Sequence, residues 1–483
     1  MKKLTDHRKD VLGHYARQLE KILVILSGLI TFGYFWFTYF NSRLDEPFQN
    51  KGNVLILGLY LVLQVTFLYV VGGLKIGVYR KRNVILSQFI GYFLVDAVEV
   101  LIMILMVGRI ARIRGLIRRS LIMYLIQVAL AVALTLLLEL LFHNLYRPKQ
   151  MMILYESKMP LRLQGKIQTR TDQFEIIGSM KVEENWREEL GRRRQETWFK
   201  AVLLQEISSP RRNDILKFCY QYNLQCYLVP KISDVLVRSA NDVEIFDTPI
   251  LYVKEYGMTY GQGVIKRFFD ILFSALGIAL TSPIMLITAI AIKAHDHGPV
   301  IFSQERCTKN KKTFRIYKFR SMVVDAEKDG VARLATEKDD RITSVGRFIR
   351  KTRIDELPQF FNILKGDMSI VGPRPERPEI IEEYTKDFPE FAYRLKVKAG
   401  LTGYAQVYGK YNTTAYDKLK LDLYYVQRYS LWLDVRLALM TIKILFLKES
   451  TEGLEEGERI ANSDQEKKEQ PDRKPAAPER KTG

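Results

Sequence analysis

Long apolar stretches dominate the first third of the chain, and short polar segments separate them. Each stretch is close to the roughly twenty residues that an α-helix needs to cross a bilayer. The pattern therefore predicts a membrane protein whose residues 1–150 form a four-helix transmembrane bundle. The four stretches are Ile22–Phe40, Val54–Val71, Val84–Val107 and Leu121–Phe142.

Three carboxylates lie within these stretches or near their ends, namely Asp96, Glu99 and Glu139. Ionisable side chains are costly in lipid and often mark a functional site. The alternative is a buried polar contact inside the bundle. The sequence alone leaves both interpretations open.

The distribution of basic residues only partly agrees with four crossings. The N-terminus and the loop near Lys81 are basic, which is typical of the cytoplasmic side. The Arg-rich segment 109–119, which we interpret as a loop, would then face outward. Either the third and fourth segments do not fully cross, or the rule fails locally. The segment contains Arg109, Arg112, Arg114, Arg118 and Arg119.

Residues 151–258 alternate short apolar strands with polar helical segments such as Arg211–Tyr222. This alternation predicts a Rossmann-like α/β domain with a parallel sheet. The turn after the first strand, Glu156–Met159, lacks the glycines of a dinucleotide fingerprint. We therefore expect a regulatory or structural role and no cofactor here. The predicted strands are Met152–Tyr155, Phe174–Ile177, Ala201–Leu204 and Cys226–Val229.

A fifth apolar run, Phe268–Ile292, is interrupted near its centre by Ser282 and Pro283. Proline removes a helical hydrogen bond and bends the helix, and the Ser282 hydroxyl can bond a freed carbonyl. The run either spans the membrane or bends and returns to the side it entered. Its length fits both arrangements. The last segment, Glu449–Gly483, is charged, has no apolar period and is expected to be disordered.

A short helix is predicted by the apolar spacing in Leu357–Leu364, with Gly366 as its stop. Asp355 is the expected N-cap and Glu356 the first helical residue. A helix N-terminus favours negative charge and can bind phosphate. Without its context, the segment is simply a capped helix followed by an arginine loop, Gly372–Pro375.

The chain is strongly basic, with 74 Lys and Arg against 54 Asp and Glu and a net charge of +20. Such a balance implies anionic partners. Because much of the charge lies beside the apolar stretches, an anionic lipid membrane is the expected partner. The sequence contains no recognisable nucleic-acid module, so we expect no nucleic-acid binding.

Motifs between residues 260 and 448 follow one another in an order that resembles the bacterial sugar transferase family, the monotopic polyprenyl-phosphate phosphoglycosyl transferases. The resemblance implies a C-terminal α/β catalytic domain over 259–448, with a re-entrant membrane helix bent at Ser282-Pro283. One departure is Cys307–Lys311, where the family has a more glycine-rich turn. The motifs are Lys266-Arg267-x-x-Asp270, Gly298–Phe302 with Gln304, Tyr317–Met322, Asp355–Gln359, Gly366–Ser369, Gly372–Pro375 and Gly400–Gly403.

The resemblance further implies transfer of a sugar 1-phosphate from a UDP-sugar to undecaprenyl phosphate, with release of UMP. This reaction would start exopolysaccharide, capsule or O-antigen repeat units. Asp355 would be the nucleophile of a covalent sugar-phosphoryl intermediate, and Glu356 would ligate Mg²⁺. Adjacent helical residues point about 100° apart. The two roles are therefore compatible if the helix start is irregular.

Six further residues are candidates for substrate binding. Arg374 suits bidentate phosphate contact unless it is merely a solvated loop residue. Lys266 and Arg267 either hold the polyprenyl phosphate or snorkel to the headgroups, while Asp270 would pair with another basic group. Further phosphate candidates are Lys318 and Arg320.

The predicted location is the bacterial inner membrane, with the catalytic domain on its cytoplasmic face. The competing hypothesis is a membrane-anchored, nucleotide-sensing regulatory protein with a degenerate transferase domain. The sequence leaves the sugar and the oligomeric state open, and a homodimer is one arrangement.

Overall fold

The structure is a computed structural model that describes residues 2–108, 110–142, 145, 148–157, 161–245, 247–253, 258–324, 339, 341–410 and 413–445. The predicted disordered segment 449–483 lies outside the described residues. The chain divides into two compact units, Met1–Pro230 and Lys231–Gly483. Each unit is described by itself.

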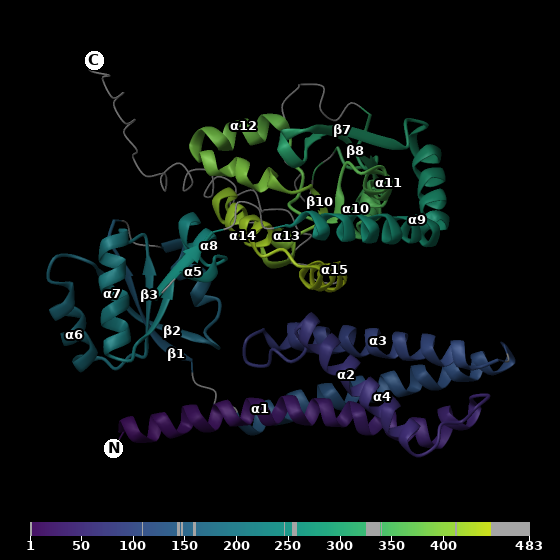
Figure 1. Ribbon diagram of the computed structural model, residues 1–483, viewed down its shortest axis with the longest axis horizontal. Helices are drawn as coiled ribbons and strands as arrows, with labels where there is room; N and C mark the ends of the chain where they lie inside the picture. The colour runs from purple at the N-terminus through teal and green to yellow at the C-terminus, as the bar shows by residue number, and fades with distance from the viewer. Residues whose placement is uncertain are drawn as a thin grey trace. The chain divides into compact units, whose positions relative to one another are not determined.

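Four long helices form the first part of unit 1 (Figure 1). All four are long and apolar enough to cross a membrane, which confirms the helices predicted from the apolar runs. Aromatic packing fills their core, where the rings of Phe32 and Tyr60 stack 3.9 Å apart. The helices are α1 (Lys2–Phe35), which continues through a π turn (Trp36–Phe40) and a 3₁₀ turn (Asn41–Arg43), α2 (Lys51–Val71), α3 (Lys81–Met106) and α4 (Ile110–Phe142).

The Arg-rich segment is not a loop, contrary to the prediction. It forms the first turns of α4, while Arg109 lies outside the described residues. Two of the charged side chains have partners near the end of α1. Arg112 pairs with Asp45 at 3.0 Å, and the Arg119 guanidinium lies 5.0 Å from the centre of the Tyr39 ring.

Two of the three carboxylates named above contact a neighbouring helix, whereas Glu99 is buried and its oxygens have no hydrogen-bond partner among the described residues. Asp96 is buried and accepts a hydrogen bond of 3.1 Å from the Tyr60 hydroxyl. Glu139 pairs with Lys81 at 2.8 Å. Asp96 therefore makes the buried polar contact that was one of its two interpretations.

The second part of unit 1 is a parallel sheet with strand order β2-β1-β3-β4. This confirms the predicted parallel α/β arrangement. Side chains alternate between the two faces, so Leu154 packs with α6 and α7 while Ile153 packs with α5 (Figure 1). The elements are β1 (Lys149–Tyr155), α5 (Leu161–Gln168), β2 (Phe174–Lys181), α6 (Trp186–Glu196), β3 (Ala201–Gln205), α7 (Ser209–Gln221) and β4 (Gln225–Leu228).

Unit 2 contains pairs of β-strands and several helices. It begins with α8 (Ile232–Val237), whose Ile232 and Val235 pack against Leu419; the predicted domain boundary at residue 258 lies well beyond this helix. The antiparallel pairs are β5 (Asn241–Ile245) with β6 (Thr248–Tyr252) and β7 (Ile301–Cys307) with β8 (Thr313–Phe319). The parallel pair is β9 (Ser369–Val371) with β10 (Gly400–Thr402). The helices are α9 (Tyr260–Asp296), α10 (Ser344–Lys351), α11 (Gln359–Lys365), α12 (Pro378–Asp387), α13 (Tyr404–Tyr408), α14 (Ala415–Gln427) and α15 (Leu431–Leu445).

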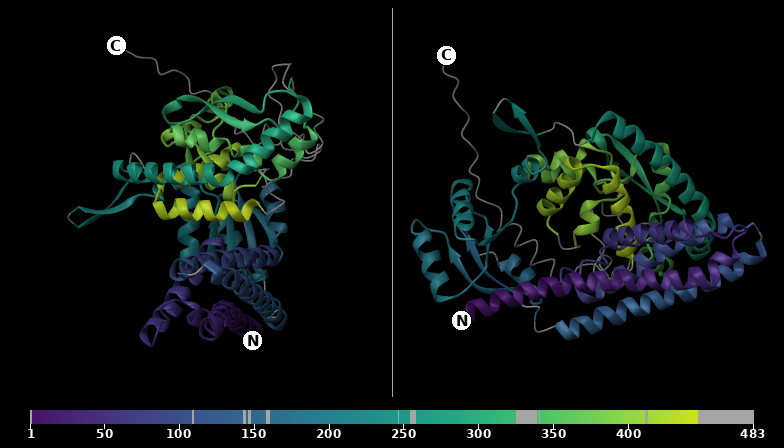
Figure 2. Two further views of the ribbon diagram at one scale, coloured as in Figure 1. Left: turned by 90° about the vertical axis from the view of Figure 1, so that its right-hand side faces the viewer. Right: turned by 60° about the horizontal axis from the view of Figure 1, so that its bottom comes forward.

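Helix α9 is bent, and Figures 1 and 2 show two legs that meet at an angle. Pro283 lies inside the helix, where its missing N–H frees the carbonyl of Ala279. The Ser282 hydroxyl donates to that carbonyl at 2.9 Å, which confirms the predicted role of Ser282. The outward side is apolar, as the 70% exposure of Leu280 and the 67% exposure of Ile287 illustrate.

Candidate active site

The two adjacent carboxylates lie in a tight turn between α10 and α11. Asp355 and Glu356 belong to a 3₁₀ turn, Ile354–Glu356, and α11 begins only at Gln359. The prediction of Asp355 as N-cap is therefore wrong, since no side-chain cap is formed and Pro358 occupies that position. Gly366 ends the helix in the left-handed conformation, as predicted.

The physical reason for this start is a series of short-range hydrogen bonds. The amides of Leu357 and Phe360 bond to carbonyls three residues earlier, each at 3.1 Å. A 3₁₀ turn has three residues per turn, so adjacent side chains point about 120° apart. The irregular start that lets the two carboxylates have different surroundings is thus present.

Glu356 is held by a group of cations. Its Oε1 lies 3.2 Å from the Lys318 ammonium and 3.1 Å from the Arg374 guanidinium, with Arg353 at 3.8 Å. Burial alone would raise the pKa of Glu356, but the charges of Lys318, Arg374 and Arg353 outweigh it and hold the pKa well below its usual range. Glu356 is therefore ionised at neutral pH.

Asp355 has a different environment, although it is the next residue along the chain. It is also buried, and its Oδ1 has no hydrogen-bond partner among the described residues. Burial, together with the charge of Glu356, raises the pKa of Asp355 to about 6. An ionised carboxylate with a free oxygen can attack an electrophile or bind a cation.

The Gly372–Pro375 loop presents Arg374 to this turn. A Cβ on Gly372 would lie 2.4 Å from the carbonyl oxygen of Lys398, so only glycine fits this close backbone contact. Arg394 donates to the carbonyl of Arg374 at 2.9 Å and pairs with the buried Asp422 at 2.8 Å. The close contact at Gly372 and the hydrogen bond from Arg394 therefore hold the loop in place, and Arg374 is half-buried.

The predicted residues of the first leg of α9 bind protein groups. Lys266 forms a buried pair with Asp434 at 2.5 Å. Arg267 donates to the carbonyls of Ile363 and Leu364, at 2.6 and 2.7 Å, at the end of α11. A phosphate would have to compete with these contacts, so the role of the two basic residues in lipid binding stays a prediction.

Asp270 and Arg320 also fasten α9. The partners of Asp270 among the described residues are the Ser369 hydroxyl and the Ile370 amide, each at 2.9 Å, instead of the expected basic group. Arg320 forms an ion pair with Asp296 at the end of α9. Of the eight predicted residues, the structure brings four together: Asp355, Glu356, Lys318 and Arg374.

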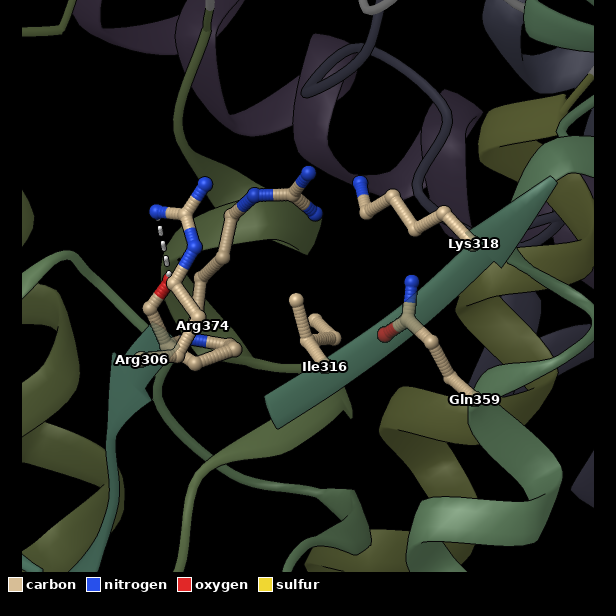
Figure 3. Close-up of a pocket in the computed structure, with 6 residues that line it drawn as sticks. Arg306, Ile316, Lys318, Gln359 and Arg374 are labelled. Carbon is tan, nitrogen blue, oxygen red and sulfur yellow. Dashed lines mark hydrogen bonds between the residues drawn. The ribbon is translucent and has the colours of Figure 1, made fainter. Parts of the chain in front are cut away.

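A pocket opens beside this group of four (Figure 3). The charged ends of Arg306, Arg374 and Lys318 lie in a row along it, above Ile316 and Gln359. The sequence analysis missed the roles of Arg306, Gln359 and Arg353. Gln359 stands inside a quoted motif, and its position directly after Pro358 was the available signal.

The turn between β7 and β8 explains how the chain does without the glycines expected there. Asn310 and Lys311 have φ angles of 59° and 60°, in the left-handed region. Asparagine tolerates that region better than most residues. The departure at Cys307–Lys311 therefore keeps a glycine-like backbone.

The donor set fits a divalent cation shared with a phosphate. The described residues contain no group of three His, Cys, Asp or Glu side chains able to hold a metal ion by themselves. Mg²⁺, however, is commonly held by one or two carboxylates plus substrate phosphates. Asp355 and Glu356 supply such oxygens, and Oδ1 of Asp355 has no other partner among the described residues.

Comparison with known proteins identifies this part of the chain. Residues 261–448 match the family model described as bacterial sugar transferase. An Aeromonas hydrophila protein named UDP-N-acetylgalactosamine-undecaprenyl-phosphate N-acetylgalactosaminephosphotransferase is 48% identical over 184 residues, 38% of this chain and 43% of that protein. An Escherichia coli protein named UDP-glucose:undecaprenyl-phosphate glucose-1-phosphate transferase is 40% identical over 205 residues, 41% of this chain and 42% of that protein.

These matches span less than half the length of either relative. A shorter Bacillus subtilis protein is matched over 73% of its length, at 51% identity over 131 residues and 27% of this chain. It is provisionally named undecaprenyl-phosphate N-acetylgalactosaminyl 1-phosphate transferase. The carboxylate pair, the arginine loop and these likenesses agree, and the chain belongs to the bacterial sugar transferase family.

Proposed function

We propose that the protein transfers a sugar 1-phosphate from a UDP-sugar to undecaprenyl phosphate and releases UMP. The observation that carries the proposal is the contrast within the carboxylate pair. Glu356 is neutralised by cations, whereas Asp355 is buried beside it with an oxygen that has no partner among the described residues. The names of the relatives support the lipid acceptor. They differ in the sugar, which we leave open.

Asp355 is the nucleophile in this proposal. A carboxylate oxygen of Asp355 attacks the phosphorus that bears the sugar, and a new O–P bond forms. The bond from that phosphorus to the bridging oxygen breaks, and UMP leaves with the electron pair. An oxygen of undecaprenyl phosphate then attacks the sugar-phosphoryl-aspartate and frees Asp355.

Charge neutralisation by the surrounding residues makes the attack possible. Nucleophile and substrate are both anionic, so they repel each other unless cations lie close by. Lys318 and Arg374 already meet at one oxygen of Glu356, and they can turn to incoming phosphate oxygens. Mg²⁺, held by Glu356 with Asp355 nearby, would supply further charge neutralisation.

We infer the membrane arrangement from the contacts of α9. Its first leg is fastened to β9 through Asp270, and its far end is fastened to Arg320, so both ends meet the same unit. A helix that crossed the bilayer would have its ends on opposite sides. This geometry supports a re-entrant helix, with the catalytic domain on the cytoplasmic face of the bacterial inner membrane.

The deciding experiment is UMP release by the full chain in lipid nanodiscs with Mg²⁺ and undecaprenyl phosphate. A panel of UDP-sugars is supplied one at a time, and we expect one or a few to give UMP and a lipid diphosphate-sugar. No UMP with any sugar of the panel would contradict the proposal and favour a degenerate, regulatory protein.

A further inference from the structure

Two residues of the pocket have no part in the steps above. Arg306 comes from β7, and Gln359 is the first residue of α11. Both line the pocket together with Lys318 and Arg374.

Gln359 carries an unsatisfied donor. Its side chain is only 2% exposed, and its amide nitrogen has no acceptor among the described residues. A buried N–H without an acceptor is destabilising, and native proteins keep few such groups. The amide lies at the wall of the pocket (Figure 3), so an oxygen of a bound ligand can satisfy it.

Arg306 is oriented by groups that contact both terminal nitrogens of its guanidinium. It donates to Oε1 of Gln304 at 2.7 Å and to the carbonyl of Pro375 at 3.4 Å, and Glu376 lies 3.8 Å away. Figure 3 shows its charged end beside that of Arg374, on the side away from Lys318. A guanidinium held in this way is suited to an anionic oxygen.

We propose that Arg306 forms the subsite for the phosphate that leaves with the nucleotide when a nucleoside diphosphate-sugar binds, and that the Gln359 amide, which lies below Lys318 in Figure 3, donates to the other phosphate of the donor. The inference rests on the proposed function. Lys318 and Arg374 converge on one carboxylate oxygen, so they can share one phosphate, the one that Asp355 attacks. A second phosphate in line with it would lie next to Arg306, whose charged end is beside that of Arg374. The lipid acceptor has a single phosphate and does not need this place.

The subsite acts when the phosphorus–oxygen bond of the donor breaks. Charge then moves onto the bridging oxygen and spreads over the phosphate of the departing nucleotide. Arg306 stabilises that charge. The electron pair leaves with the nucleotide, and no further reactant is required.

Kinetics measured with both substrates can distinguish this role from a general disruption of the active site. In a ping-pong reaction, kcat/KM for the donor reports the steps up to nucleotide release, and kcat/KM for the acceptor reports the second half. The variants are Arg306→Ala, Gln359→Leu and Gln359→Met, in the full chain in nanodiscs. Arg315→Ala is the matched control, because Arg315 lies exposed on β8 and is not among the residues that line the pocket.

We expect Arg306→Ala to lower kcat/KM for the UDP-sugar about 10- to 100-fold, the usual scale for a lost hydrogen bond to a charged group. Product inhibition by UMP should weaken by a similar factor. The Gln359 variants should lose about 5- to 20-fold in the same parameter. Their thermal unfolding temperature should stay the same or rise, because an unpaired donor has been removed. In Arg306→Ala, the acceptor kcat/KM should change less than twofold.

Wild-type protein that releases no UMP contradicts the proposed function itself. Active wild-type protein with variants that match Arg315→Ala overturns the subsite alone. Equal losses in the donor and acceptor parameters of Arg306→Ala also overturn it, because they would indicate damage to the shared site around Arg374. Two apolar replacements of Gln359 guard against a failure of one variant to fold.

Discussion

Acidic side chains lie near the N-termini of helices in both α/β regions of this protein, and their surroundings differ. In the sheet of unit 1, Glu156 follows β1, and its carboxylate accepts the Ser208 amide at the start of α7 at 2.5 Å. The Ser208 hydroxyl and Arg211 bond its other oxygen at 3.2 and 2.8 Å. In unit 2, Asp355 is buried with an oxygen that lacks a partner among the described residues.

The comparison shows that a carboxylate near a helix start can attack an electrophile or bind a cation only when its neighbours leave an oxygen without a hydrogen-bond partner. Glu156 neutralises the α7 N-terminus at the edge between β1 and β3, the place where open α/β sheets usually bind ligands. A pyrophosphate arriving there would meet a carboxylate. This supplies a physical reason for the expectation that the domain binds no dinucleotide, which stays a prediction.

The largest expected effect is that of Asp355→Asn. An amide cannot form the acyl phosphate, so UMP release should fall by about 10⁴-fold or more. The measurement is UMP formation in a single turnover, with a melting curve to show that the variant is folded. Continued UMP release at the wild-type rate would exclude Asp355 as the nucleophile.

The second-largest effect is expected for Arg374→Ala. Removing one of the cations that hold Glu356 should lower kcat by about 10²- to 10³-fold. It should also raise the pKa of Glu356, because Arg374 is among the charges that depress it. The exposed Arg347 offers a control of the same chemistry in Arg347→Ala. Equal activity of the two variants would contradict a role for Arg374.

The pH dependence of nucleotide release gives a smaller effect. Burial raises the pKa of Asp355 to about 6, and only the ionised form is nucleophilic. The rate should therefore be constant above that pH and fall tenfold per unit well below it. A single-turnover profile without any decline between pH 7 and about 5 would contradict this assignment.

The smallest effect is expected for Glu156→Gln. The change weakens hydrogen bonds to a partly exposed carboxylate, which stabilise by about 1 kcal/mol. We expect a slightly lower unfolding temperature and unchanged kcat/KM for both substrates. If the variant lost transfer activity instead, the contrast between the two carboxylates would be wrong, and the domain would have a part in the reaction.

Local sequence patterns were sufficient to predict several helices and strands of the fold. The apolar runs predicted α1–α4 and α9 because crossing a bilayer requires a minimum helical length. Alternating apolar strands predicted the parallel sheet, and Pro283 with Ser282 predicted the bend and the bonded carbonyl of Ala279. In each case, the cause lies within a few residues of its effect.

Contacts between distant residues explain what the sequence analysis missed. Lys266 meets Asp434, Arg112 meets Asp45 and Asp270 meets Ser369 across long separations along the chain. A basic side chain can bind phosphate readily only if it does not already have such a partner. The sequence could predict which residues carry charge, but only the folded chain decides which charges are already neutralised. In the same way, only the packing of the turn shows that Oδ1 of Asp355 is buried without a partner among the described residues.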